Sequence, residues 1–467
     1  MRARSRKPRT TVLIAAVLCP ALSLAAAAFG ADQTDRTFGT DGIAEIPLPV
    51  EAQGAGTAIW DLANAPGAKM VAAIGNFSGY AYFAAARFSR NGSLDTSFGN
   101  GGFTEAIESS GPGAEVLTQA QAVAVQGDGK VVVAGYRQQD AGHTPALAPI
   151  LVRYRSDGTL DPSFGRDGKV MPKFGAESPD PAHLEEGGGA LHDVAIEASG
   201  RIVAIGARNE IGGGRPAGMV IAYRPNGGID RDFGRAGRVF FSSIRDHRYT
   251  ALRSIKVLPS GKLLVSGYLH SRLFLARLTA DGKLDPSFGG GDGKVSIRVA
   301  GRYGCDGCRM PGSLGVDRRG RIIVLANRSL SLPVLARFLP DGSLDRSFGQ
   351  RGLSVPHTAG SFGEGFGLAL QKDSQIVVAG FEIGTTPTGH EKLVFAALRF
   401  LPNGRFDRSF GKEGLQAPAI GRESAALAAL TQPSGRVVAG GLSVEGQSGH
   451  IGEASLLLTR YLPGAGG

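Results

Sequence analysis

A six-residue phrase, Leu-Asp-Pro-Ser-Phe-Gly, recurs along the chain and constrains its fold more than any other feature. It stands intact at 160–165 and 284–289, and variants occupy 94–99, 229–234, 344–349 and 406–411. A partial copy at 35–39 precedes them. The phenylalanine of the phrase therefore stands at positions 38, 98, 164, 233, 288, 348 and 410. Seven copies spaced by about 60 residues indicate one repeated structural unit instead of several unrelated domains.

Short apolar runs and tight turns alternate between successive copies of the phrase. In the second repeat, residues 120–126 alternate apolar and polar side chains, as a half-buried strand does. Residues 130–135 are apolar and β-branched, which is typical of a buried strand. Asp128-Gly129 between them predicts a tight turn, because glycine tolerates a positive φ. With further strands at 150–154 and 168–174, the unit is predicted to contain four antiparallel strands.

The two ends of the chain hold complementary parts of one such unit. Residues 456–461 have the pattern of a third strand, and a fourth-strand candidate, 42–48, follows the partial phrase near the other end. Closing a ring in this way leaves no open sheet edge between the ends. We therefore predict an all-β fold: a single seven-bladed β-propeller in residues 32–467, closed by an N-terminal outer strand that completes the C-terminal blade. An open β-solenoid is the alternative, but it would not need this division.

The repeat resembles a known bacterial family. The resemblance rests on the Lys-Val-Val-Val-Ala-Gly run at 130–135, on Leu-Val-Arg-Tyr at 151–154 and on the recurring phrase. This pattern is similar to the delta-60 repeat, and the resemblance covers the chain from about residue 32 onward. It implies a propeller of tandem repeats, and it implies no activity, cofactor or catalytic residue.

Each residue of the phrase has a predicted structural role. The leucine and the phenylalanine are expected to pack between sheets, the aspartate to form an Asx-type turn, and the glycine to adopt a positive φ. Calcium binding by the repeated aspartates is the alternative, but calcium loops gather several carboxylates within a dozen residues. An arginine is the next-to-last residue of the third strand in most repeats, and Ala222 replaces it in the third repeat.

The N-terminal segment has the pattern of a secretory signal peptide. Its basic residues are Arg2, Arg4, Arg6, Lys7 and Arg9, followed by an apolar run at 12–24 and small residues at 25–28. Residues 1–31 are therefore predicted to be removed on export to the periplasm or the exterior. A membrane anchor is the alternative, but the run is short for a spanning helix and no later segment qualifies. Leu18 before Cys19 argues against lipidation, since a small residue is usual there.

The charge of the chain does not favour a nucleic-acid partner. Of the net charge of +10, five positive charges lie in residues 1–31, so the remainder carries about +5 dispersed among turns. A nucleic-acid interface needs clustered basic residues with aromatic residues for stacking, and neither pattern is present. We expect no nucleic-acid partner, no integral membrane segment after cleavage, no cofactor and a monomeric protein.

Loops of variable length are the predicted location of a binding site. In antiparallel blades the first-to-second and third-to-fourth turns share one face, and the longer, variable connections share the other. Variable loops on a rigid scaffold commonly carry function. We therefore predict a binding face that includes Tyr136 and Arg137, in a loop at 136–149, and Phe381 and Glu382, in a loop at 381–392. The leading hypothesis is a non-catalytic propeller that binds a protein, a peptide or an envelope glycan.

An enzyme is the competing hypothesis, with a lyase or hydrolase acting on a polysaccharide over the central channel. The weak candidates for its acid–base site are His192, Asp193, Glu185 and Glu186, the densest titratable group in the chain. The eight histidines are all expected on or beside the variable face: His143, His183, His192, His247, His270, His357, His390 and His450. None has the close spacing of a metal site, and no nucleophile or phosphate-binding motif occurs. A purely structural part of an envelope assembly is the third hypothesis.

Cys305 and Cys308 are the cysteines that remain after signal cleavage. In an exported protein, a local disulfide that closes this glycine-containing loop is the expected state. A redox-active Cys-x-x-Cys normally lies at a helix N-terminus, which this stretch lacks, and zinc would need two more ligands.

Overall fold

The structure is a computed structural model of the whole chain. It describes residues 32–49, 52, 56–76, 82–107, 117–140, 145–172, 188–209, 217–241, 250–269, 272–299, 313–328, 332–356, 362–385, 389, 391–420, 422–444 and 454–463. The predicted signal peptide lies outside these residues.

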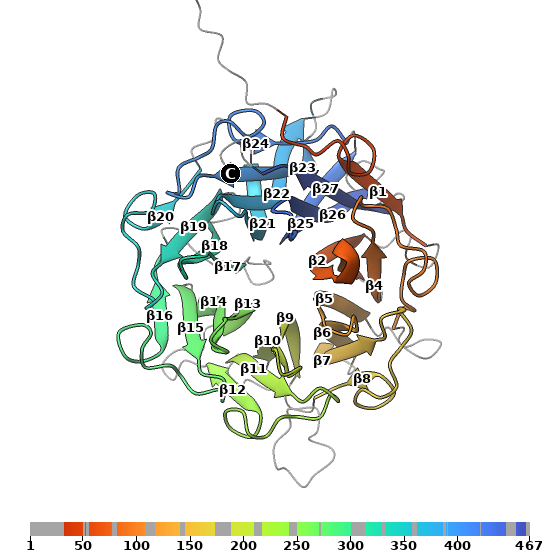
Figure 1. The fold of residues 1–467 in the computed structure, drawn as a ribbon, viewed down its shortest axis with the longest axis vertical. Helices are drawn as coiled ribbons and strands as arrows, with labels where there is room; N and C mark the ends of the chain where they lie inside the picture. Colours follow the sequence, from red (N-terminus) through yellow and green to blue (C-terminus); the bar gives the residue numbers. More distant parts are fainter. Residues whose placement is uncertain are drawn as a thin grey trace, which may run out of the picture.

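Seven antiparallel sheets are arranged around a central axis, each with its first strand innermost (Figure 1). The inner strands are β2 (Thr57–Ala65), β5 (Leu117–Val125), β9 (Gly188–Ile196), β13 (Thr250–Val257), β17 (Leu314–Val316), β21 (Phe362–Leu370) and β25 (Glu423–Thr431). The second strands are β3 (Lys69–Asn76), β6 (Val131–Asp140), β10 (Ile202–Asn209), β14 (Leu263–Leu269), β18 (Ile322–Arg328), β22 (Ile376–Thr385) and β26 (Val437–Val444). The third strands are β4 (Phe83–Phe88), β7 (Pro145–Tyr154), β11 (Ala217–Tyr223), β15 (Arg272–Leu278), β19 (Leu332–Phe338), β23 (Glu391–Phe400) and β27 (Ala454–Tyr461).

The outer strands are short: β8 (Lys169–Val170), β12 (Arg238–Phe241), β16 (Lys294–Ile297), β20 (Leu353–Ser354), β24 (Leu415–Gln416) and β1 (Ile43–Pro47). In the first blade a bridge between Ala86 and Phe103 stands in place of an outer strand. The helical content of the described residues is the 3-10 turn η2 (Pro66–Ala68) and residue 52, which also has 3-10 conformation. The predicted all-β, seven-bladed propeller is confirmed.

The ring is closed as the sequence predicts. Strand β1 pairs antiparallel with β27, from Ile43 opposite Thr459 to Pro47 opposite Ser455. The backbone N–H of Asp35 also donates to the carbonyl of Arg460 at 2.8 Å. The last blade thus takes three strands from the C-terminal part and its outer strand from the N-terminal part, and the solenoid alternative is wrong.

Apolar cores lie between neighbouring blades. One cluster joins Val132 and Leu151 of the second blade to Leu191, Ile202 and Met219 of the third, and all five are buried. Because each sheet buries both of its faces in this way, the second and third strands are almost continuously apolar. This burial makes the ring a rigid frame around its axis.

In six of the seven blades, an arginine beside the recurring phrase donates to a backbone carbonyl of the next blade, and we call this arrangement the interblade latch. In the fifth blade, the Oδ2 atom of Asp345 accepts a 2.8 Å hydrogen bond from Nε of Arg337, on the third strand. Its Oδ1 atom accepts from Ser347, two residues on, as in an Asx-type turn. The same guanidinium stacks 4.4 Å from the Phe348 ring and donates to the carbonyl of Pro402 in the next blade. The phrase therefore holds blades together, and its aspartate forms the turn predicted from the sequence.

The phenylalanine of the latch is packed on its other side by the next blade. Gly404 has a φ of +83°, and a Cβ atom there would lie 2.7 Å from the Phe348 ring. The glycine that follows the phenylalanine, Gly349, also has a positive φ, of +51°. Both glycines have a positive φ that favours glycine, and at Gly404 a side chain would also clash with the Phe348 ring.

The third blade keeps the latch although Ala222 replaces the usual arginine. Arg201, the residue immediately before the second strand β10, donates from Nη1 to Oδ2 of Asp230 at 3.3 Å. It also donates to the carbonyl of Ala280 in the next blade and lies 5.5 Å from the Phe233 ring. Arg201 thus contacts the same three kinds of partner as Arg337 does: the aspartate and the phenylalanine of the phrase, and a backbone carbonyl of the next blade.

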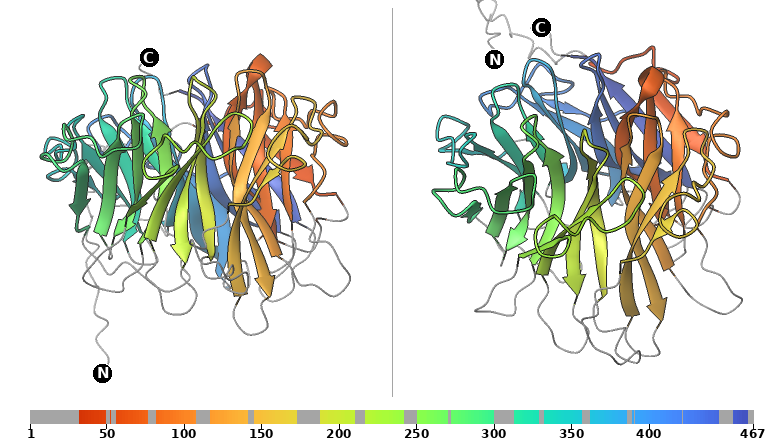
Figure 2. Two further views of the ribbon diagram at one scale, coloured as in Figure 1. Left: turned by 90° about the horizontal axis from the view of Figure 1, so that it is seen from below. Right: turned by 60° about the horizontal axis from the view of Figure 1, so that its bottom comes forward.

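The connections between strands alternate between the two faces of the ring. Every first-to-second and third-to-fourth connection within a blade lies wholly in the described residues, and these short turns share one face (Figure 2). The second-to-third and fourth-to-first connections lead to the opposite face, and each contains residues outside the described ranges. The alternation of faces predicted from the sequence is confirmed.

Two of the predicted loops are mostly strand, which corrects the sequence analysis. Tyr136 and Arg137 lie in β6 and pair with Pro149 and Ala148 of β7. Phe381 and Glu382 likewise lie in β22 and pair with Phe395 and Val394 of β23. The strands continue past their apolar runs because the backbone hydrogen bonds of a sheet do not depend on side-chain hydrophobicity.

Candidate functional site

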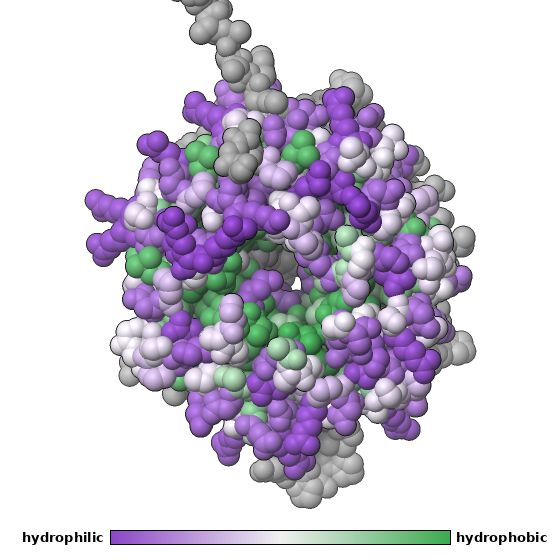
Figure 3. Space-filling view, viewed as in Figure 1, coloured by the Kyte–Doolittle hydropathy of each residue, from purple (hydrophilic) through white to green (hydrophobic). Residues whose placement is uncertain are grey.

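The central channel contains a pocket of about 440 Å³, lined by residues of all seven inner strands. Figure 3 shows the face of the short turns, with a hollow at its centre and hydrophobic residues on its walls. The lining runs along each inner strand toward these turns, for example from Trp60 to Asn64 in β2. The pocket thus opens on the face opposite to the predicted binding loops.

Six of the inner strands carry one extra residue at the same place in the repeat. The pairing register shifts there, as in a β-bulge. The extra residues, which we call the channel ring, are Trp60, Gln121, His192, Arg253, Phe366 and Leu427. The corresponding position of the fifth blade, residue 312, lies outside the described residues. Because a bulge redirects a side chain, each of these six blades adds one further side chain to the pocket while the strand pairing on either side of the bulge continues.

The channel ring is divided into two arcs of different chemistry. Gln121, His192 and Arg253 come from three consecutive blades and form a polar arc. Phe366 and Leu427 come from the two blades that precede Trp60 around the ring, and these three form an apolar arc. Trp60 and Phe366 are packed against a cluster of buried apolar residues that contains Leu427. A ligand in the pocket would contact aromatic surface on one side and hydrogen-bonding groups on the other.

Arg253 is the cation of the polar arc. Its Nη1 atom lies 3.3 Å from Nδ1 of His192, on the neighbouring blade. Its Nε atom is buried and makes no hydrogen bond within the described part of the chain. Among the described ion pairs, none includes Arg253, whereas each arginine of an interblade latch faces an aspartate.

Two aspartates lie beside the ring and connect inner strands. Asp61 Oδ2 accepts a 3.0 Å hydrogen bond from the backbone N–H of Val123, on the next blade. Asp193 Oδ2 accepts in the same way from Ile255 at 2.8 Å. The second oxygen of each carboxylate accepts from the residue that follows it in its own strand. All four oxygens therefore have backbone donors.

The charges of these two aspartates influence one another. Burial, and then the proximity of Asp193, raises the pKa of Asp61 to about 7. Burial also raises the pKa of Asp193, although the charge of Lys256 and the hydrogen bond from Ile255 oppose this. Asp61 can therefore hold a proton near neutral pH.

Two of the four predicted catalytic residues lie within the described part of the chain. His192 and Asp193 lie in β9 and line the channel pocket. Glu185 and Glu186 lie outside the described residues, as do the other seven histidines. Cys305 and Cys308 also lie outside them.

The four predicted binding residues lie in two separated blades, in β6 and β22. The hydroxyl of Tyr136 donates to Oε1 of Gln119, in the inner strand of the same blade. The ring centroids of Phe381 and Phe366 are 6.1 Å apart, so Phe381 packs against a residue of the apolar arc. Of the four residues, Phe381 is thus the one with a described contact to the channel ring.

Sequence reasoning missed Trp60, Gln121, Arg253, Phe366 and Leu427 as a set. These residues differ in type, so they leave no repeated letter. The signal that could have found them is their shared position in the repeat, which in blade two is the second residue of the first-strand pattern at 120–126.

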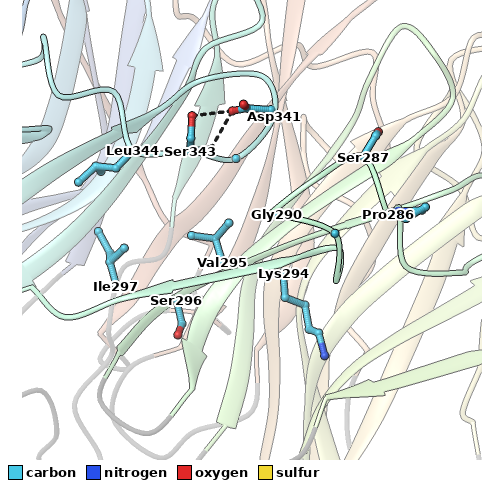
Figure 4. A pocket seen from close by; sticks show the side chains of 13 residues that line it. Pro286, Ser287, Gly290, Lys294, Val295, Ser296, Ile297, Asp341, Ser343 and Leu344 are labelled. Carbon is cyan, nitrogen blue, oxygen red and sulfur yellow. Dashed lines mark hydrogen bonds between the residues drawn. The ribbon is translucent and has the colours of Figure 1, made fainter.

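A second hollow, of about 720 Å³, lies at the outer rim between β16 and the turn at 341–344 (Figure 4). Glycines 289–291 form part of its wall. The Asp341 carboxylate already accepts hydrogen bonds from the N–H and hydroxyl of Ser343 at 2.9 and 2.7 Å. This carboxylate is therefore engaged in its own turn, and the channel pocket is the better candidate site.

The described residues contain no group of three or more His, Cys, Asp or Glu side chains that could hold a metal ion. They also include no helix with the length and apolar character needed to span a bilayer.

Four segments match the model of a family described as a domain of unknown function (DUF5122) beta-propeller: residues 70–98, 126–164, 258–288 and 320–348. Each segment contains the second and third strands of one blade and ends on the phenylalanine of the recurring phrase. The repeat is a β-propeller repeat. No curated protein matches the sequence.

Solved structures with a similar arrangement include a protein of unknown function from Dyadobacter fermentans, with a TM-score of 0.46 and 9% identity, covering 90% of this chain and 99% of that one. The NanB sialidase from Streptococcus pneumoniae also has a TM-score of 0.46 at 9% identity, covering 90% of this chain and 71% of the sialidase. The polysaccharide lyase Uly1 has a TM-score of 0.37 at 12% identity, covering 73% and 89%.

Proposed function

We propose that this protein is a non-catalytic binding or scaffold protein that holds a protein segment, a peptide or an envelope glycan at its central channel. The observation that carries the proposal is the divided channel ring, in which aromatic surface at Trp60 and Phe366 faces polar groups at His192 and Arg253. Binding pockets commonly combine apolar walls with a few convergent polar groups. The sequence favoured the opposite, variable face for the ligand, and the described pocket favours the channel.

The aspartates beside the ring support binding over catalysis. Each oxygen of Asp61 and Asp193 accepts a hydrogen bond from a backbone N–H. Ser313, at the corresponding position of the fifth blade, similarly donates to the carbonyl of Phe366 in the next blade. Side chains at this position thus serve to join inner strands.

A polysaccharide lyase or hydrolase is a second candidate function. One observation favours it: the pKa of Asp61 is raised to about 7 by burial and by Asp193, which suits a general acid near neutral pH. In that case His192 and Asp193 would line the reaction site.

Binding and turnover can be measured on the same preparation. We expect members of a panel of glycans and peptides to raise the melting temperature without forming product, and Trp60→Ala to abolish the increase. Phe240→Ala, which removes an exposed aromatic residue from outer strand β12, should leave it intact. Product formation from a polysaccharide that is lost in His192→Ala would contradict the proposal and establish the enzyme.

We also propose that the repeats are of the delta-60 type, that residues 1–31 are removed on export to the periplasm or exterior, and that Cys305 and Cys308 form a disulfide. The intact mass of protein recovered from that compartment should correspond to a chain beginning near residue 32. Reduction should add the mass of two hydrogens. Full-length mass, or free thiols before reduction, would contradict these proposals.

A further inference from the structure

We infer that the channel pocket accommodates a ring-bearing carboxylate, with the carboxylate on Arg253 and the ring against Trp60 and Phe366. This inference rests on the proposed binding function and specifies its ligand. Two kinds of compound share the required chemistry: an aromatic or alicyclic acid, and a uronic-acid sugar.

The argument for a carboxylate begins with the different use of arginines in this fold. Arg337 of the fifth-blade latch is buried against Asp345, with its charge balanced by the fold itself. Arg253 is half-buried in the channel, and the described residues provide it with no carboxylate partner. Placing a cation in such a site is costly unless an anion compensates for it. A carboxylate ligand would supply that compensation through two parallel hydrogen bonds.

The neighbouring groups are consistent with an anion at this point. Asp193 lies on the same side of the channel, and its carboxylate accepts hydrogen bonds from the backbone N–H groups of Ile255 and Val194. This acid is therefore directed toward the backbone. Lys256, three residues after Arg253 in β13, also lines the pocket and is exposed. A second cation is thus available where the pocket opens.

The argument for a ring comes from the opposite arc. Trp60 and Phe366 are half-buried, so part of each aromatic surface remains open to the pocket. Flat apolar faces stack on aromatic or alicyclic rings, including the apolar face of a sugar. The volume of about 440 Å³ falls in the range of pockets that bind small molecules, about 300–1,000 Å³.

Trp60 is the single tryptophan of the chain, so its fluorescence reports directly on the pocket. The probes are phenylacetate and glucuronate, with benzyl alcohol and glucose as their neutral counterparts. We expect a saturable change in Trp60 emission with at least one of the two carboxylates, and at least tenfold weaker binding of its neutral counterpart. Which of the two binds distinguishes an aromatic acid from a uronic acid.

Arg253→Gln should weaken binding of the carboxylate at least tenfold while the circular dichroism spectrum is unchanged. The matched control is Lys283→Gln, which removes a highly exposed cation outside the pocket. Equal affinity for the neutral counterpart, an unchanged affinity in Arg253→Gln, or no response of Trp60 to either carboxylate at millimolar concentration would overturn the inference. Saturable binding of glucose or benzyl alcohol alone would overturn it while leaving the proposed binding function in place. Turnover of a probe would instead contradict that function.

Discussion

At the level of single residues, one position, described in six of the seven inner strands, gives this ring its chemistry. Trp60, His192 and Arg253 occupy that position in three different blades, and each is the extra residue of a β-bulge. A bulge lets the side chain change while the hydrogen bonds on either side stay the same. The side chain at this position can therefore vary to suit the pocket without changing the strand pairing that holds the blade together.

The carboxyl of Asp61, next to this position, makes stability depend on pH. Burial, followed by Asp193, raises its pKa to about 7, above the value of about 3.9 for an unfolded chain. The folded state then binds more protons than the unfolded state between about pH 4 and pH 7, so the free energy of unfolding falls as the pH rises through that window. We expect Asp61→Asn to remove on the order of 2 kcal/mol of this fall, measured by urea unfolding at pH 5 and pH 8.

A suitable control is Asp232→Asn, because that side chain is 90% exposed on the third blade. It should retain the pH dependence of the unchanged protein. If Asp61→Asn and Asp232→Asn show the same dependence, the raised pKa of Asp61 is wrong.

The sequence could identify His192 and Asp193 as pocket residues only in part, through their titratable side chains. Trp60, Arg253 and Phe366 could not be found by repetition, because a functional position in a repeat is the one where the copies differ. Their convergence also depends on closure of the ring, which brings blades that are far apart in sequence around one axis. The placement of Tyr136 and Phe381 in loops was wrong because strand pairing continues beyond the apolar run.

At the level of elements, the recurring phrase predicts the blades because it performs the same task in each. In every blade except the third, its aspartate pairs with an arginine of the third strand. In the fifth blade this arginine also donates to the carbonyl of Pro402 in the next blade. The order of strands and the positions of turns followed from this spacing. The arginine's role could not be derived from the sequence, since the contact with the next blade exists only when two units are packed together.

The third blade allows a test of the interblade latch. Arg201→Gln should destabilise the protein by about 2–3 kcal/mol, because both Glu197 and Asp230 then lose their closest cation. Lys262→Gln, at the same position of the fourth blade, should cost less than about 1 kcal/mol, since Arg277 remains 2.6 Å from Asp285. Urea unfolding at neutral pH measures both. Equal losses of unfolding free energy in the two variants would contradict the claim that Arg201 replaces the missing third-strand arginine of this blade.

At the level of the whole molecule, closure depends on a strand from the other end of the chain. Five residue pairs join β1 to β27, and the Asp35 carboxylate accepts from Nε of Arg460 at 2.9 Å. The ring thus has no open edge at the junction of its ends, and the channel wall is complete only in the closed state.

Deletion of residues 32–48 together with the preceding segment should lower the melting temperature by several degrees and promote association, because the edge of β27 becomes exposed. The control is a chain that lacks residues 1–31 alone, which should form a stable ring. Differential scanning calorimetry and light scattering measure the two properties. An unchanged melting temperature in the longer deletion would contradict the role assigned to β1.

The most direct test of a ligand site in the channel is a crystal structure of the protein grown with the carboxylate that alters Trp60 emission. The account predicts one bound molecule inside the ring, with its carboxylate within hydrogen-bond distance of the Arg253 guanidinium and its ring against Trp60 and Phe366. Density for the ligand only on the variable-loop face, or only at the outer rim, would contradict it.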